Sequence, residues 1–172
     1  MIYKMKVRKA KHSDINTIGE IFIYARAYMK ASGNPNQWKD NRPEMATVIH
    51  DIDEGNFYVI EDSGQIVGCF AFIIGEDPTY KDIKNGSWLN EEPYGTIHRI
   101  ASNGQATGLF ECVLNYCRPL VGNIRIDTHA DNKIMQHLLE KCGFKYCGII
   151  VTDDGTDRMA YQCNSSRLIK NT

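Results

Sequence analysis

The clearest structural signal in the sequence is a pair of apolar runs on either side of a very short turn. Residues 56–62 (NFYVIED) and 65–74 (QIVGCFAFII) are rich in β-branched and aromatic residues, and Ser63 and Gly64 separate them. Such runs joined by a short glycine-containing turn predict an antiparallel hairpin. Because a hairpin must pack its apolar residues against other elements, we expect a sheet at the centre of the fold.

Helical and strand patterns alternate on both sides of this hairpin. In chain order we expect a strand around Val7, a helix capped by Ser13, a loop over 31–44, a helix over 45–55, the hairpin, a strand over 95–101, a helix from about Gly108 to Pro119, a strand over 123–130, a helix capped by Asp131 or Asn132 and ended by Gly143, and a closing hairpin over 146–163. This order predicts an α+β protein built on a mixed sheet.

Length and charge limit the classes of function. At 172 residues the chain fits one domain, with a core over about residues 5–163 and a polar, frayed tail over 164–172. Its 20 basic and 21 acidic residues are interspersed and leave a net charge of −1, so a nucleic acid is not expected as a partner. No apolar run resembles a membrane span or a signal peptide, so we expect a cytoplasmic protein that does not bind membranes.

The six cysteines are expected to be reduced thiols. They lie mostly among apolar residues, in a chain too long to require a disulfide framework. Cys112 and Cys117 would splay apart on a helix, so the C-x4-C spacing is a poor zinc motif and no metal is expected. Cys112 and Cys142 are interpreted as buried packing residues rather than nucleophiles.

Residues 75–94 form a long segment without clean periodicity, and loops of this length are often functional. This segment and the 31–44 loop carry aromatic and acidic side chains. They are Trp38, Tyr80, Trp88 and Tyr94, and Asp77, Asp82, Glu91 and Glu92. As a group they suit the binding of a cationic amine, although each one alone is more often a surface or core residue.

The stretch ASNGQATGLFE (101–111) joins a predicted strand to a predicted helix. The N–H groups of the first helical turn and the positive end of the helix dipole would lie beside Gly104 and Gly108, which suits a pyrophosphate. It is not the phosphate loop of nucleotide triphosphatases, because Leu109 and Phe110 stand where a lysine and a hydroxyl residue should follow. By itself, a turn of this kind is more often an ordinary connection.

Three motifs in register restrict the interpretation further. They are Gln105-x-x-Gly108-x-Phe110 in the loop, the strand NIRIDTHA (123–130), and Asn132 followed by Gly143-Phe144. With them the chain resembles the GNAT superfamily of acetyl-CoA-dependent N-acetyltransferases over roughly residues 5–163. The resemblance implies a mixed, mostly antiparallel central sheet of about seven strands, flanked by about four helices.

The resemblance also implies that acetyl-CoA is the co-substrate. Backbone groups of Ile100, Ala101 and Ser102 would bind its pantetheine arm, and Asn132 would contact the arm or cap the last helix. The N–H groups that would hold the pyrophosphate belong to Gln105, Ala106, Thr107, Gly108, Leu109 and Phe110. The implied reaction is direct attack on the thioester by a primary amine of a small molecule or a peptide.

Three positions depart from the family's pattern, the first of which is Phe110, where the loop motif of the family ends in glycine or alanine. Many members carry a tyrosine acid seven residues after the asparagine, where this chain has Leu139, and some carry a glutamate base at the position of Tyr94. The candidate catalytic residues are His98, His129 and Tyr94. The two histidines are candidates because the side chain of histidine titrates near neutral pH. In a regular strand His98 shares a face with Tyr94 and Ile100, and a hydrogen-bonded core histidine is an equally good interpretation.

The strand that follows the loop ends with Asp127 and His129. In this family the end of that strand parts from its neighbour, so both side chains are candidates to face the acceptor amine. Asp127, Trp38, Tyr80 and Trp88 are the residues expected to bind the acceptor.

Two alternatives stay open. One is a GNAT-fold protein that binds CoA or an effector with weak or no catalysis, which Leu139 and the bulky Phe110 favour. The other is an unrelated α+β binding domain, which requires the three motifs to be in register by chance. For the loop to bind a pyrophosphate, Phe110 must point into the core with Val113 and Leu114. The protein is expected to be a monomer or a homodimer.

Overall fold

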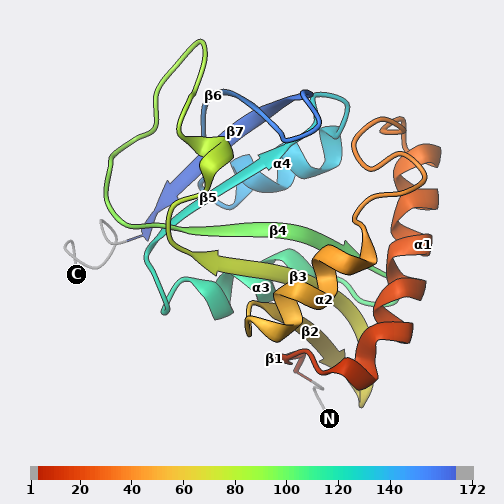
Figure 1. The fold of residues 1–172 in the computed structure, drawn as a ribbon. Helices are drawn as coiled ribbons and strands as arrows, with labels where there is room; N and C mark the ends of the chain where they lie inside the picture. Colours follow the sequence, from red (N-terminus) through yellow and green to blue (C-terminus); the bar gives the residue numbers. More distant parts are fainter. Residues whose placement is uncertain (1–3, 166–172) are drawn as a thin grey trace.

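A computed structural model describes residues 4–165, which form a mixed α+β fold (Figure 1). The elements are β1 (Lys6–Lys9), η1 (His12–Asp14), α1 (Ile15–Ala31), α2 (Met45–Asp53), β2 (Phe57–Asp62), β3 (Gln65–Ile74), η2 (Pro78–Tyr80), β4 (Gly95–Ser102), α3 (Leu109–Cys117), β5 (Asn123–Thr128), α4 (Lys133–Lys141), β6 (Lys145–Val151) and β7 (Asp157–Asn164). The strands form one sheet in the order β1-β2-β3-β4-β5-β7-β6. β4 and β5 run parallel, and the other neighbouring pairs are antiparallel. The expected mixed sheet of seven strands with four helices is confirmed.

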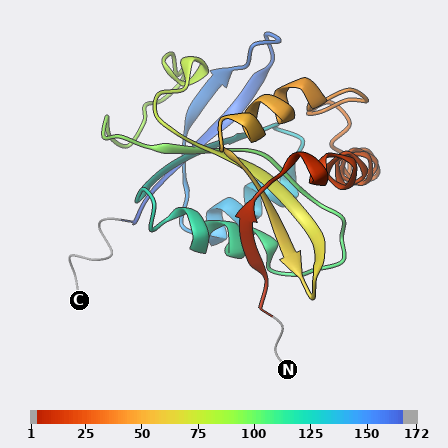
Figure 2. The ribbon, with the colours of Figure 1, turned by 60° about the horizontal axis from the view of Figure 1, so that its bottom comes forward.

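The helices cover both faces of the sheet. Figure 2 shows α1 and α2 on one side and α3 and α4 on the other. Consecutive residues of β2 explain this arrangement, because Phe57 and Val59 pack in the core with α1, whereas Tyr58 and Ile60 pack in the core with α3 and α4. The predicted hairpin over 56–74 is therefore buried on both faces, which accounts for its nearly continuous apolar sequence.

The ends of α4 follow the sequence prediction. The side chain of Asn132 caps the helix, because its Oδ1 accepts the backbone N–H of Met135 at 3.0 Å. Gly143 follows the helix with a φ of 88°, the left-handed conformation that glycine adopts most easily.

Ser13 does not cap α1, and that prediction is wrong. Residues 12–14 form a 3₁₀ turn that runs directly into the helix, so Asp14 stands at the N-cap position. The carboxylate of Asp14 accepts the backbone N–H of Lys11 at 2.8 Å and pairs with Arg8 at 2.8 Å. These two contacts come from β1 and the turn before the helix, and they place Asp14 rather than Ser13 at the junction.

Two strand boundaries also differ from the predictions. β5 ends at Thr128 instead of residue 130, because the Nδ1 atom of His129 accepts the backbone N–H of Asp131 and the chain turns there. Asn164 belongs to β7 rather than to a frayed tail. The rest of that predicted tail, from residue 166 on, lies outside the described residues.

β4 is not a regular strand. Cys69 of β3 pairs with Ala101, whereas Ala71 pairs with His98, so a single residue of β3 faces both Arg99 and Ile100. Arg99 has a φ of 53°, which is uncommon for a residue with a side chain. Because of this bulge Ile100 packs against the core with α3 and α4, and the expectation that it shares a face with His98 is wrong.

A buried ion pair holds Arg99 in this conformation. Its Nε and Nη2 atoms lie 2.8 and 2.6 Å from Oδ2 of Asp51, which belongs to α2. The exposed fractions of the two side chains are 19% for Arg99 and 6% for Asp51, so water screens the pair little. The ion pair offsets the cost of the left-handed backbone at the bulge.

We expect Asp51→Ala to destabilise the protein by roughly 3 kcal/mol, because it leaves the guanidinium of Arg99 buried without a partner. Adding Arg99→Gly should recover at least half of that loss, since glycine adopts the positive φ without strain and removes the unpaired charge. Urea unfolding of the two variants and the wild-type protein measures both differences. A double variant no more stable than Asp51→Ala would contradict this account of the bulge.

Candidate active site

β4 and β5 pair over only two positions among the described residues, Gly95 with Ile124 and Thr96 with Arg125. Beyond these pairs the strands part, as Figure 1 shows. A cavity of about 470 Å³ lies beyond this point, between the second half of α1, the end of β4 and the first residues of α3 and α4. The divergence leaves backbone groups of β4 without a neighbouring strand on that side.

Most of the residues expected to bind acetyl-CoA line this cavity. They are Ile100, Ala101, Ser102, Ala106, Gly108, Leu109, Phe110 and Asn132, whereas Gln105 and Thr107 do not line it. Tyr24 and Tyr28 of α1, which the sequence did not single out, also line the cavity. Gly104 has a φ of 77°, the left-handed conformation that glycine adopts most easily, and it lies against the hydroxyl of Tyr24.

The loop between β4 and α3 presents a row of backbone donors. The Oγ of Ser102 accepts the N–H of Gly104, and Oδ1 of Asn103 accepts the N–H of Gln105, each at 3.0 Å. The N–H groups of residues 106–111 have no partner among residues 4–165. Together with the positive end of α3, these donors fit a pyrophosphate.

Phe110 does not cover these donors with an exposed ring. It is 4% exposed and packs with Val113 and Leu114, and its ring lies 6.3 Å from that of Phe144. Phe110 therefore packs in the core, as a loop that binds a pyrophosphate requires.

His98 and Asp77 form a hydrogen-bonded pair on the other face of β4. Nε2 of His98 lies 2.8 Å from Oδ2 of Asp77, and the two side chains are 20% and 17% exposed. The backbone N–H of Asp77 in turn donates to Oη of Tyr94 at 2.8 Å. Two candidate catalytic residues, His98 and Tyr94, are thus brought together through a residue that the sequence suggested only as an attractor for a cationic amine.

The carboxyl of Asp77 is ionised near neutral pH. Burial raises its pKa, but hydrogen bonds from His98 and Thr79 outweigh this effect and lower the pKa to about 2. Because an ionised carboxylate only accepts hydrogen bonds, Nε2 of His98 carries a proton. Nδ1 is then the nitrogen left to accept a proton, and it has no partner within the described part of the chain.

The aromatic residues of the 75–94 segment are mostly buried. Tyr80, Trp88 and Tyr94 form a small core together with β6 and β7. The guanidinium of Arg125 lies between two of these rings, 4.1 Å from that of Trp88 and 4.0 Å from that of Tyr94. The segment is thus a packed insertion, and its rings hold polar groups in place.

Asp127 joins this cluster at the end of β5. Its Oδ2 accepts a hydrogen bond of 2.7 Å from the hydroxyl of Tyr80, and the carboxyl is half-buried. Trp38 lies elsewhere, in the loop after α1, where its ring meets that of Phe22 of α1 edge-on at 5.6 Å. The structure therefore brings Asp127 and Tyr80 together and places Trp38 in a different environment.

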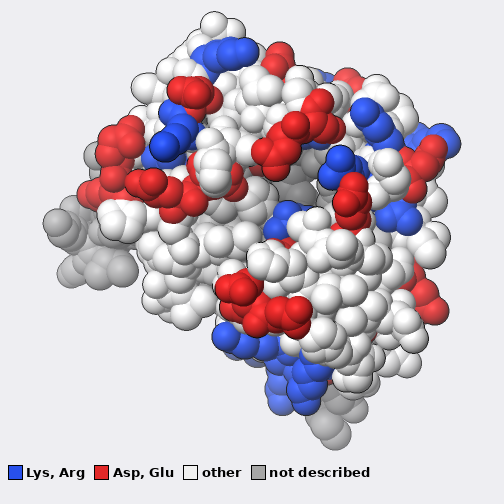
Figure 3. All heavy atoms as spheres, viewed as in Figure 1, with Lys and Arg blue, Asp and Glu red and all other residues white. Residues whose placement is uncertain are grey.

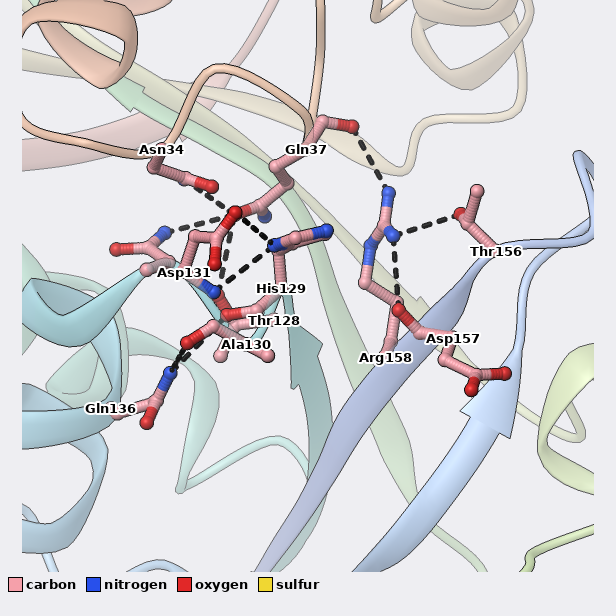
Figure 4. Close-up of polar contacts among 11 residues, drawn as sticks. Asn34, Gln37, Thr128, His129, Ala130, Asp131, Gln136, Thr156, Asp157 and Arg158 are labelled. Atoms are coloured by element: carbon pink, nitrogen blue, oxygen red, sulfur yellow. Dashed lines mark hydrogen bonds and ion pairs between the residues drawn. The ribbon is translucent and has the colours of Figure 1, made fainter.

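His129 lies just beyond β5 in a separate polar cluster (Figure 4). Burial and the nearby charge of Arg158 lower its pKa, which favours the neutral ring. Since its Nδ1 accepts the backbone N–H of Asp131 at 3.0 Å, Nε2 carries the proton. His129 can therefore donate a hydrogen bond but is poorly arranged to act as a base.

The position of the usual tyrosine acid holds a core residue. Leu139 is fully buried between α4 and the sheet. Cys112 and Cys142 pack against the same core, and burial raises the pKa of both thiols, which does not favour a nucleophile.

Acidic side chains gather near the candidate site. Figure 3 shows the face seen in Figure 1, with a hollow near its centre and acidic groups over the 75–94 segment. The exposed ones are Glu76, Asp82, Glu91 and Glu92. In residues 4–165 no group of three potential metal ligands lies together, and no helix there is long and apolar enough to cross a membrane.

Solved structures resemble this one closely. A GNAT-family acetyltransferase from Streptococcus agalactiae is 32% identical, with a TM-score of 0.85 over 95% of this chain and 98% of that chain. One from Listeria monocytogenes is 20% identical, with a TM-score of 0.70 over 93% and 94%. The yncA protein of Salmonella typhimurium, solved with its cofactor acetyl-CoA, is 14% identical, with a TM-score of 0.57 over 93% of each chain.

Sequence comparison gives the same family. No curated protein sequence matches the chain significantly. The model of the acetyltransferase (GNAT) family, however, matches residues 24–144, which is well over half of the chain. The protein therefore belongs to the GNAT acetyltransferase family, whose members use acetyl-CoA.

Proposed function

We propose that the protein transfers the acetyl group of acetyl-CoA to a primary amine of a small molecule or a peptide. The observation that carries this proposal is the cavity beside the end of β4, which begins at the unpaired N–H groups of the loop and passes Ile100 and Ala101. A cavity of this kind suits an elongated ligand with a phosphate group at one end.

The residues that would hold acetyl-CoA follow from this geometry. Backbone N–H groups of residues 106–110 would bind the pyrophosphate, and backbone groups of Ile100, Ala101 and Ser102 would bind the arm. The N–H of Gln105, which was also expected to bind the pyrophosphate, already donates to Asn103. Asn132 lines the same cavity while it caps α4. When bound, acetyl-CoA supplies the thioester carbonyl that the amine attacks.

His98 is the proposed general base. Its Nδ1 accepts a proton from the attacking amine, and the carboxylate of Asp77 stabilises the positive ring that results. Tyr94 fixes the backbone of Asp77, so its proposed role is to position this pair. Asp127, supported by Tyr80 and Trp88, offers a negative charge to a cationic acceptor, and the N–H of His129 offers a donor.

A second candidate function is the binding of CoA or an effector with weak or no catalysis. Leu139 favours it, because a fully buried leucine stands where many members of the family have an acid. The two functions share the cavity and differ in whether His98 transfers a proton.

CoA should stabilise the wild-type protein by roughly 2.7 kcal/mol at 100 times its dissociation constant. Gly108→Asp should abolish most of this effect, because its carboxylate would compete for the loop N–H groups and repel the pyrophosphate. Gly155→Asp is the matched control, since Gly155 has a φ of 79° against 73° for Gly108 and lies in the β6–β7 turn. Thermal melting with and without CoA measures both. Equal stabilisation of the two variants would show that the loop does not bind CoA.

His98→Ala should lower amine-dependent release of CoA by about 100-fold or more, because the proton acceptor is lost. Its stabilisation by CoA should stay at the wild-type level, because His98 does not line the cavity. His12→Ala is the control, since His12 also pairs with an aspartate but is exposed. Thiol release over a panel of amines provides the rates. Full turnover by His98→Ala would remove His98 as the base, and no turnover by the wild-type protein would favour the second candidate function.

The stability that Asp77 contributes should disappear in acid. Its pKa is lowered to about 2 from an ordinary value of 3.8, so its contribution is present above about pH 4 and is lost as the pH falls toward 2. We expect the wild-type protein to melt above Asp77→Asn at pH 6, with the difference shrinking between pH 4 and 2. A difference in melting temperature that stays constant over that range would contradict the assigned role of the carboxylate.

A further inference from the structure

Gln37, in the loop between α1 and α2, connects segments that lie far apart in the sequence. Its Oε1 accepts hydrogen bonds from Asn34 and Asn132 at 2.9 Å and a longer one from Thr128 at 3.4 Å. Its backbone oxygen accepts a hydrogen bond from Arg158 at 3.0 Å. Figure 4 shows these groups meeting around Gln37. The 32–44 loop is therefore attached to β5, α4 and β7 around the place where β4 and β5 part.

The backbone of α4 determines which way these amide groups face. The N–H of Met135 can only donate, so Asn132 must turn Oδ1 toward it and Nδ2 toward Gln37. Gln37 must then present its oxygen, and Asn34 must present its Nδ2. One backbone donor thus sets the orientation of three side chains.

Two of these side chains belong to the wall of the cavity. Asn34 comes from the loop after α1 and Asn132 from the start of α4, and both line the space that Ile100 and Ala101 also line. Gln37 itself does not line it. Its contacts lie behind the wall, so it acts on the cavity through its two asparagine neighbours.

The orientation leaves one polar atom unsatisfied. Asn34 is 3% exposed, and its Oδ1 has no hydrogen-bond donor among the described residues. A buried acceptor without a donor costs about 1–3 kcal/mol. The group that would satisfy it is an N–H donor, and the pantetheine arm of CoA carries two amide N–H groups.

We propose that Gln37 is a positioning residue for the pantetheine arm, and that Asn34 offers the arm an acceptor for an amide N–H. The proposal rests on the proposed function, since it assumes that the arm lies in this cavity. It adds residues of the α1–α2 loop to the binding of acetyl-CoA, beyond the β4–α3 loop and Asn132. The residues of the α1–α2 loop would act on the arm, whereas the β4–α3 loop would hold the pyrophosphate at the other end of the ligand.

Calorimetric titration with two ligands tests this inference. CoA carries the arm, and adenosine 3′,5′-bisphosphate carries the nucleotide and a 5′-phosphate without it. Gln37→Leu should raise the dissociation constant of CoA about tenfold, as expected when one hydrogen bond is lost, and leave that of the bisphosphate unchanged. Gln37→Glu should stay within about threefold of the wild type for both ligands, because Gln37 accepts these hydrogen bonds through its oxygens and a carboxylate keeps them.

Two further variants complete the test. Asn34→Ala should raise the dissociation constant of CoA about fivefold and leave that of the bisphosphate unchanged. This variant tests the inference if Gln37→Leu does not fold. Thr128→Val is the control, since Thr128 is fully buried, contacts Gln37 at 3.4 Å and does not line the cavity. It should bind CoA within about twofold of the wild type.

Three results would overturn the inference. They are unchanged CoA binding by Gln37→Leu and Asn34→Ala despite a lower melting temperature, an equal loss for both ligands, and weakening by Gln37→Glu as large as that by Gln37→Leu. A wild-type protein that binds neither ligand would instead refute the proposed function, so the two failures are distinguishable.

Discussion

The bulge at Arg99 is the feature on which the site depends. An unbroken alternation along β4 would place His98 and Ile100 on the same face of the sheet. The extra residue separates them, so His98 meets Asp77 on one face while Ile100 reaches the cavity wall and the opposite core. One irregular residue thereby separates the proposed base, His98, from the residue that lines the cavity, Ile100. The buried contact with Asp51 connects this division to α2.

The short pairing of β4 with β5 has a second consequence. Two paired positions hold the strands together at one end, and the 75–94 segment packs at that same end through Tyr94 and Arg125. At the other end, Gln37 joins the flanking elements through side chains instead of a backbone ladder. The opening is thus bounded at both ends by packed contacts, which keeps its walls in place while its backbone groups stay available for a ligand.

The sequence predicted those parts of the structure that short-range patterns determine. The loop glycines, the Asn132 cap, the Gly143 cap and both hairpins each depend on residues a few positions apart. Several failures instead involve side-chain contacts that join different elements of the fold. Ser13 is displaced because Asp14 pairs with Arg8 of β1, and the bulge requires Asp51, 48 residues from Arg99. Gln37 meets Asn132 across 95 residues, and nothing near Gln37 in the sequence marks that contact.

The absence of an acid at Leu139 weighs less against catalysis than it first suggests. The ordinary pKa of an alkyl amine such as lysine is about 10.4, whereas that of a thiol such as cysteine is about 8.5. Near neutral pH the amine is mostly protonated and must lose a proton before it can attack. The departing thiolate is a weaker base than the amine, so it has less need of a proton. Proton removal is therefore the larger demand, and a base is needed more than an acid. Under the proposed function His98 would meet that demand, because its Nε2 is held by an ionised Asp77 and its Nδ1 is left to accept the proton.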